Sequence, residues 1–258
     1  MVRLRYSYKT KITFSENVRS HYFLLRFTPN SYPFQQLAED NCSITPLENY
    51  SVGTDVFGNK IFSGHIGDPH TFFEFEATGV VEQTHYRIEE ELNRIYLYPS
   101  KLTKSMTGID QIFNRIDISV VRDIEGKVKL LSRELHQTFR YVPGVTNVHT
   151  TAEQALEIGS GVCQDYAHIL IALCRKGDIP ARYVTGFMRG EGFTHAWIEY
   201  YDNGVWYGFD PTHDRKIETG YIKIAHGRDY EDCIIDRGIF SGLAQQKLEV
   251  FLKVEQEQ

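Results

Sequence analysis

The 258-residue sequence predicts an α+β fold, with an N-terminal antiparallel β-sandwich followed by helices packed on an antiparallel sheet. Three observations carry this prediction. The first ~110 residues alternate between apolar and polar side chains, as strands do. After Pro99 the apolar spacing becomes helical, and after Pro180 strand-like segments return. We therefore expect two domains, residues 1–110 and residues 111–258.

The N-terminal segment has the period of two that half-buried strands require. From Leu4 to Phe14 the even positions are apolar or neutral, whereas odd positions carry Arg5, Lys9 and Lys11. Further strands are expected at residues 21–27, 50–56, 60–65 and 71–81, with a tight turn at 57–59. Short strands joined by turns, in a chain with 13% aromatic residues, favour a sandwich.

The second half contains helix signals and then strand signals. Apolar residues between Ile124 and Phe139 recur at helical spacing, which predicts one amphipathic helix. Thr151 followed by Gln154 forms a capping-box pattern for a short helix, which Gly159 and Gly161 end. A third helix is expected over residues 162–176. Strands are then expected at 182–188, 195–201 and 205–209, and a final strand or helix at 245–258.

Composition and charge exclude several classes of function. The net charge is −6 and no basic stripe is present, so we expect no nucleic-acid partner. No run reaches the ~18 apolar residues of a membrane span, and the N-terminus does not resemble a signal peptide. The four cysteines form no CxxC pair, which predicts free thiols and a cytoplasmic protein.

Cys163 is the candidate nucleophile. It follows Gly159-Ser160-Gly161-Val162 at the expected start of a helix, where unpaired N–H groups and the positive end of the dipole favour a thiolate. The alternative is a small buried hydrophobic residue, which is the common role of a free cysteine. Cys174, deep in the same helix, is assigned to packing.

His195 and Asp210 lie on one predicted hairpin. Asn203-Gly204 between two strand-like runs indicates a two-residue turn, in which the numbers of paired residues sum to 407. His195 and Asp210 are then diagonal neighbours on one face, within reach of each other. A three-residue loop would place them on opposite faces. The alternatives are an ordinary strand histidine and a turn aspartate before Pro211.

Four segments resemble the transglutaminase-like family in that family's order, over roughly residues 125–215. They are Gly161-Val162-Cys163-Gln164-Asp165-Tyr166-Ala167, Ile179-Pro180-Ala181-Arg182-Tyr183-Val184-Thr185-Gly186, His195-Ala196-Trp197-Ile198-Glu199 and Asp210-Pro211-Thr212. The N-terminal strands, with Asp55-Val56-Phe57-Gly58-Asn59, resemble the β-sandwich of bacterial members. The resemblance implies a papain-like core with a triad of nucleophile Cys163, base His195 and orienting acid Asp210.

Other site expectations are less specific. The backbone N–H of Cys163 is the expected oxyanion donor, with the Gln164 side chain as a helper or only a solvent-facing helix residue. Trp197 is expected either to wall the site or to pack in the core. No cofactor or metal is expected, because Cys163, His149, His168 and His213 lack recognisable ligand spacing. The loop Arg189–Gly192 is either a moving segment or an ordinary hairpin loop.

The leading functional hypothesis is a cysteine peptidase or amidase that acts through a thioester acyl-enzyme. Its partner would be a peptide or protein substrate with an amide group. The runner-up is a protein-glutamine gamma-glutamyltransferase, which passes the acyl group to an amine. A third hypothesis is a non-catalytic binding or scaffold module, against which the intact Cys, His and Asp set argues.

Overall fold

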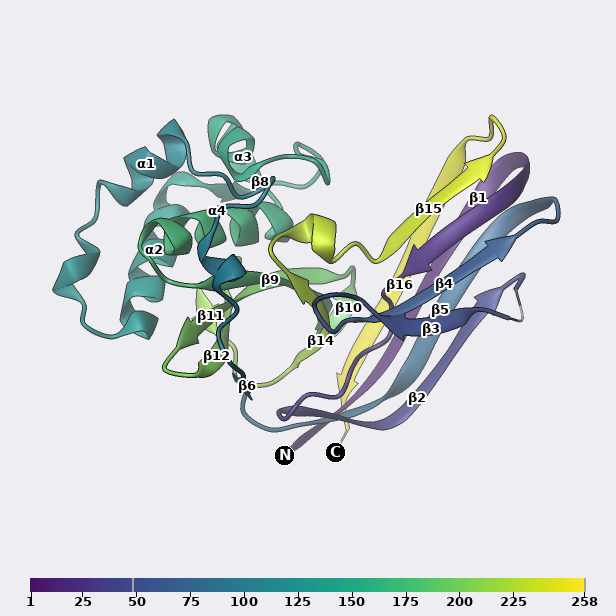
Figure 1. The fold of residues 1–258 in the computed structure, drawn as a ribbon, viewed down its shortest axis with the longest axis horizontal. Coiled ribbons are helices and arrows are strands. Elements are labelled where there is room, and N and C mark those ends of the chain that lie inside the picture. The colour runs from purple at the N-terminus through teal and green to yellow at the C-terminus, as the bar shows by residue number, and fades with distance from the viewer. Residues whose placement is uncertain (48, 258) are drawn as a thin grey trace.

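A computed structural model describes residues 1–47 and 49–257. A β-sandwich forms one side of the molecule, and helices with a second sheet form the other (Figure 1). The strands are β1 (Val2–Leu25), β2 (Gln35–Thr45), β3 (Ser51–Thr54), β4 (Lys60–Ile66), β5 (His70–Gln83), β6 (Arg87–Glu89), β7 (Arg140–Tyr141), β8 (Ser160–Gly161), β9 (Ala181–Met188), β10 (Gly190–Gly192), β11 (His195–Asp202), β12 (Val205–Asp210), β13 (Arg215–Lys216), β14 (Tyr221–Gly227), β15 (Asp236–Ser241) and β16 (Gln246–Gln256). The α-helices are α1 (Thr107–Phe113), α2 (Ile124–Thr138), α3 (Ala152–Ile158) and α4 (Cys163–Lys176).

The long strand β1 runs through both layers of the sandwich. Its first part pairs with β5 and β16, and its last part, Arg19–Leu25, pairs with β15, while β4 pairs with residues 21–25. The register shifts between Arg19 and Tyr22, where Ser20 has a φ of 48°. Such an irregularity lets one strand change sheets. The predicted α+β fold with an N-terminal sandwich is confirmed.

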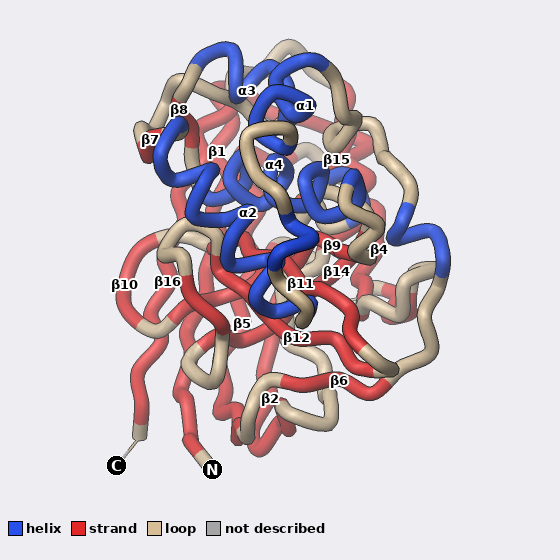
Figure 2. The backbone as a smooth tube through the Cα atoms, turned by 90° about the vertical axis from the view of Figure 1, so that its left-hand side faces the viewer, coloured by secondary structure: helices blue, strands red, loops and turns tan. Residues whose placement is uncertain are grey.

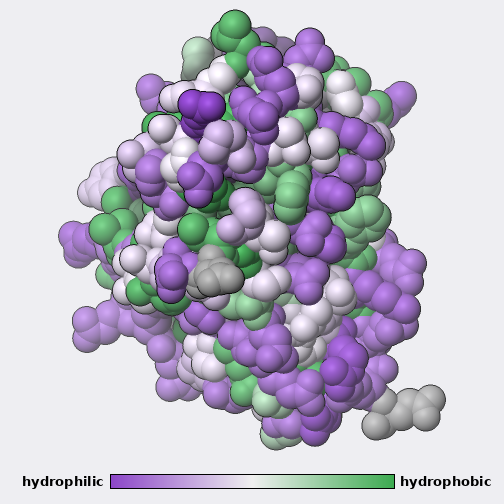
Figure 3. All heavy atoms as spheres, turned by 90° about the vertical axis from the view of Figure 1, so that its right-hand side faces the viewer, coloured by the Kyte–Doolittle hydropathy of each residue, from purple (hydrophilic) through white to green (hydrophobic). Residues whose placement is uncertain are grey.

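The alternation in β1 gives the sandwich its core. All six even-numbered side chains from Leu4 to Phe14 are buried, and Thr10 is the polar one among them. They meet aromatic side chains of the other strands, including Phe73 and Phe75, which are fully buried. Each large apolar side chain contributes roughly 1.5–3 kcal/mol by its removal from water. The outward face of the sandwich is mostly hydrophilic (Figure 3).

Both ends of the chain belong to the sandwich. The C-terminal segment expected as a strand or a helix is the strand β16, which lies antiparallel to β1 from Leu4 to Phe14. β15 also pairs with β1, whereas β6, from the N-terminal part, pairs with β12 of the second sheet. The division between residues 110 and 111 stays a prediction, and strand pairing crosses it in both directions.

The predicted helices form on their predicted signals. Thr151 and Gln154 exchange the two bonds of a capping box at the start of α3, and Gly159 ends that helix with a φ of 76°. In α4 every residue from Asp165 to Arg175 is buried, not only the predicted apolar face, because α4 lies between other helices and the strands β9 and β11. The helices gather at one end of the molecule, away from the chain termini (Figure 2).

The second sheet has the strand order β13-β12-β11-β9-β14, and β6 pairs with β12. Its central hairpin has the predicted register, because Asp202 pairs with Val205 and Ile198 pairs with Phe209. Asn203 and Gly204 both have positive φ, 47° and 87°, as a two-residue turn requires. No helix in the described residues is long and apolar enough to cross a membrane.

Candidate active site

Cys163 is the first residue of α4, and a buried carboxylate holds the backbone that leads to it. Asp165 accepts hydrogen bonds from the Val162 N–H at 2.8 Å and from the Thr146 hydroxyl at 2.7 Å. A side chain at Gly161 would collide with the same carboxylate, so the chain passes close to Asp165. Burial raises the pKa of Asp165, against the effect of these bonds. The contacts with Asp165 therefore hold the backbone at the start of α4, where the Cys163 thiol lies.

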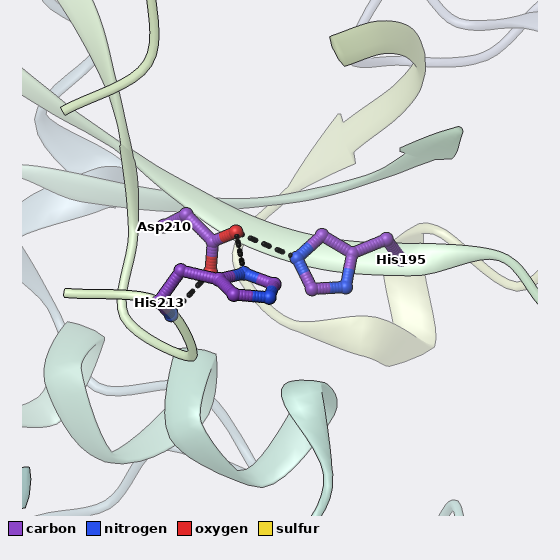
Figure 4. Close-up of side chains that lie close together, drawn as sticks. All are labelled: His195, Asp210 and His213. Atoms are coloured by element: carbon purple, nitrogen blue, oxygen red, sulfur yellow. Dashed lines mark hydrogen bonds and ion pairs between the residues drawn. The ribbon is translucent and has the colours of Figure 1, made fainter. Parts of the chain in front are cut away.

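His195 and Asp210 are brought together by the hairpin. His195 begins β11, Asp210 ends β12, and the Nε2 atom of His195 lies 2.8 Å from Oδ2 of Asp210 (Figure 4). Asp210 is fully buried and His195 is 8% exposed. Cys163 and His195 line the same cleft, and the thiol contributes to the raised pKa of the imidazole. Since Nε2 is engaged by Asp210, the second ring nitrogen, Nδ1, is the atom left for the thiol.

The charges of this group are strongly perturbed. Burial would lower the pKa of His195, but its hydrogen bonds to Asp210 and Cys163 raise that pKa to about 9. Burial would raise the pKa of Asp210, yet the hydrogen bonds from His195 and His213 hold it well below its usual range. The site therefore favours an imidazolium beside an ionised carboxylate.

Two further side chains converge on Asp210. Its Oδ2 atom also accepts hydrogen bonds from Nδ1 of His213 at 2.7 Å and from the hydroxyl of Tyr221 at 2.6 Å (Figure 4 shows the two histidines). Oδ1 accepts from the Thr212 N–H at 2.9 Å. The sequence prediction missed Tyr221, because β14 reaches the site only through tertiary packing. The sequence did contain a signal for the contact between His213 and Asp210, because His213 follows Asp210 by only three residues.

The structure also brings together a different set of potential metal ligands from the one considered in the sequence. His195, Asp210 and His213 each offer an atom within 4.8 Å of the others. Both histidines hydrogen-bond to Oδ2 of Asp210. His168 is instead buried in α4, where it accepts a bond from the Tyr230 N–H, and His149 borders a separate surface hollow.

The thiol and the imidazole face one cleft of about 510 Å³. Cys163 is partly exposed there, and His213 has 41% of its side chain exposed. The other lining residues come from the second sheet, from β7, from the sandwich and from the segments that connect the strands: Tyr141, Met188, Arg189, Gly190, Glu191, Gly192, Phe193, Thr194, Thr212 and Leu252. A substrate and water can therefore both reach the reacting groups.

Gln164 and Trp197 lie outside the lining of this cleft. The Gln164 side-chain amide donates to the carbonyl of Val148 at 3.3 Å. Trp197 is fully buried, donates its Nε1–H to the Tyr86 hydroxyl at 3.1 Å and stacks beside the His195 ring. In this structure Gln164 ties a loop to α4, and Trp197 packs in the core behind the histidine.

The fold and the site together define a class of protein. Its papain-like core follows a β-sandwich and carries a cysteine at the start of a helix, a histidine on a strand and a buried aspartate. Residues 116–211 match the family described as the transglutaminase-like superfamily, and residues 4–82 match the bacterial transglutaminase-like N-terminal region. The chain belongs to the transglutaminase-like superfamily.

The chain is also similar to individual proteins. An uncharacterized protein of Mycobacterium leprae is 28% identical over 98% of this chain and 99% of its own length. A protein-glutamine gamma-glutamyltransferase of Pseudomonas aeruginosa is 32% identical over 109 residues, which are 35% of this chain and 16% of that protein. The crystal structure of a proposed cysteine protease from Cytophaga hutchinsonii matches 99% of this chain and 90% of that chain, with a TM-score of 0.80 and 22% identity. At that identity the last match concerns the fold alone.

Proposed function

We propose that this protein is a cysteine peptidase or amidase, with Cys163 as nucleophile, His195 as general base and acid, and Asp210 as the orienting carboxylate. One observation carries the proposal. The His195 imidazole lies 2.8 Å from a fully buried carboxylate and lines one cleft with the partly exposed Cys163 thiol. A histidine oriented by a third group and paired with a thiol is the arrangement that activates a cysteine nucleophile.

Acylation begins when the Cys163 thiolate attacks the carbonyl carbon of an amide. A C–S bond forms, and the carbonyl oxygen takes up the negative charge. Cys163 is in the first turn of α4, whose N–H groups have no partner within the helix, and the backbone N–H of Cys163 would stabilise the oxyanion. When the C–N bond breaks, the His195 imidazolium gives its proton to the leaving nitrogen, and a thioester remains.

Deacylation uses water. The neutral His195 takes a proton from a water molecule as that water attacks the thioester carbonyl, and the C–S bond breaks to release the acid and restore the thiol. Asp210 stabilises the imidazolium that forms in this step. The partial exposure of Cys163 and His213 supports hydrolysis, because water shares the cleft with the acyl group.

A second candidate is transfer of the acyl group to a primary amine. The local similarity to a protein-glutamine gamma-glutamyltransferase favours it, although it covers only 35% of this chain. Both reactions share the thioester and differ only in the group that attacks it.

The test incubates a casein digest with the protein, with and without a labelled primary amine, and identifies the products by mass spectrometry. The proposal expects new carboxyl termini or deamidated side chains, no label in the product, and no reaction for Cys163→Ala. The matched control, Cys42→Ala, removes a partly exposed thiol from the sandwich and should react normally. Incorporation of the amine would favour the transferase, and an inert wild-type protein would favour the scaffold hypothesis.

A further inference from the structure

The segment expected as a mobile or ordinary hairpin loop is a strand of the sandwich. It connects β9 to β11, but its residues Gly190–Gly192 form β10, which pairs antiparallel with β16. Arg189 donates its N–H to the Gly220 carbonyl and bonds Gln256 with its guanidinium, and Glu191 forms an ion pair with Lys253 at 3.4 Å. The sandwich thus holds a wall of the cleft that contains Cys163 and His195.

This wall consists of backbone. Gly190 and Gly192 line the cleft, and a Cβ atom added at either position would meet no atom within 4 Å. Their φ angles of 131° and 149° are ones that other residues rarely adopt. At these two positions no side chain therefore covers the main chain beside the reacting side chains.

β10 is also the last strand of its sheet. The strand order is β10-β16-β1, and β10 pairs with no second strand in the part of the chain that the structure describes. In an antiparallel ladder, the N–H and C=O groups of alternate residues point away from the partner. Consequently the N–H and C=O groups that point to the free edge belong either to Glu191 or to Gly190 and Gly192. Another extended chain can pair with these groups.

We propose that the free edge of β10 binds the substrate as an added antiparallel strand, so that the substrate is an extended, flexible polypeptide segment. This inference rests on the proposed function and names its substrate class. A folded protein that offers one side-chain amide, or a small free amide, would leave this edge unused.

Apolar side chains beside the free edge of β10 indicate which side chains the bound substrate segment carries. Phe193, directly after β10, is 77% exposed, and Tyr141 on the β7 side of the cleft is 53% exposed. Leu252 of β16 is paired with Gly192 and borders the cleft, although most of its side chain is buried. Because side chains of an extended peptide alternate between faces, we expect an apolar residue at every second position.

The test starts from a pool of blocked heptapeptides. The peptide with the highest kcat/KM is resynthesised with one backbone amide N-methylated at a time, and a small blocked amide of the same acyl residue serves for comparison. We expect kcat/KM to fall about tenfold or more at alternate positions and little at the positions between, because N-methylation removes a strand hydrogen bond. Losses without alternation, or a small amide that reacts as well as the peptide, would overturn the proposal.

Two glycine variants provide a matched protein-side test. Gly192→Ala and Gly58→Ala both place a Cβ at positive φ in open space, but Gly58 lies in the remote turn between β3 and β4. Only Gly192→Ala should raise KM for the peptide, whereas Gly58→Ala should leave KM at the wild-type value. Equal KM values in the two variants would contradict the proposal.

Cys163 alkylation separates this proposal from the proposed function. If the thiol is activated but hydrolyses none of the peptides, the strand-addition proposal fails and the thiol site stands. If the thiol is not activated, the proposed function fails and the strand-addition proposal falls with it.

Discussion

The Nε2 atom of His195 lies 2.8 Å from Oδ2 of Asp210, although 15 positions separate the two residues in the sequence. A two-residue turn at Asn203-Gly204 sets this relationship, because a one-residue change in register would move one partner to the other face of the sheet. The contact leaves Nδ1 of the histidine for Cys163. The chemistry proposed for the cleft therefore depends on the geometry of one hairpin.

Replacement of Asp210 by Asn tests the orienting role. The amide keeps the size of the side chain but cannot stabilise an imidazolium, so we expect kcat to fall by about 10²–10⁴-fold. The measurement is steady-state hydrolysis of the best peptide. Asp202→Asn, on the same hairpin but at its turn, is the control and should leave kcat within about twofold. A normal kcat for Asp210→Asn would refute the role.

The pH dependence follows from His195. Its pKa is raised to about 9, so the imidazolium is present below that pH and is lost above it. Acylation needs this proton for the leaving nitrogen, and we expect kcat/KM for acylation to decline with an apparent pKa near 9. The raised pKa also stabilises the folded state below the unfolded value of about 6.5, and this contribution is lost as the pH rises through about 9. A decline of kcat/KM with an apparent pKa near 6.5 would contradict the account.

His213 competes with His195 for one carboxylate oxygen. Its Nδ1 lies 2.7 Å from Oδ2 of Asp210, so His213→Ala should make that oxygen a stronger acceptor for His195 and raise the pKa of His195. We expect the alkaline limb of the pH profile to move upward by about half a unit to one unit. His149→Ala, which removes an exposed histidine outside the cleft, should not move it. A downward shift in His213→Ala would be inconsistent with the competition.

A buried ion cluster supports the sheet that carries the site. Glu199 accepts hydrogen bonds from Nζ of Lys223 at 2.8 and 2.9 Å and from Arg182, and all three side chains are fully buried. Burial and the charge of Arg182 lower the pKa of Lys223 to about 7, against the effect of Glu199. Glu199→Gln removes the carboxylate paired with Lys223 and leaves Arg182 paired with Glu90 alone, so we expect a loss of about 3–5 kcal/mol in the free energy of unfolding.

Urea denaturation measures this loss. The exposed ion pair of Arg87 and Glu89 supplies the control, because Glu89→Gln should change stability by less than about 1 kcal/mol. Equal stability of the two variants would show that the buried cluster does not hold the sheet.

The features predicted from the sequence are those that local patterns encode. The hairpin register follows from Asn203-Gly204, the start of α3 follows from its capping box, and the first strand follows from a period of two. The helix α1 was not predicted, since Met106 provides no side-chain cap and Gly108 lies in its first turn. Most of β2 is polar and exposed, so it lacks the alternation that marks a strand.

The parts of the site that were missed depend on pairing between distant segments. Gly190–Gly192 resembles a loop and becomes a strand only because β16 lies beside it. Tyr221 and Leu252 carry no local signal for a role near Asp210 or Cys163. They reach the cleft because β14 and β16 pack there, which a single sequence does not encode at short range.

The alkylation rate of each cysteine by iodoacetamide over about pH 4–9, followed by mass spectrometry, tests the central claim most directly. The account predicts that Cys163 reacts far faster than Cys42 at low pH, because His195 activates the thiol as a nucleophile, and that His195→Ala removes this advantage. A Cys163 thiol that reacts like Cys42 throughout, or a rate that His195→Ala leaves unchanged, would contradict it.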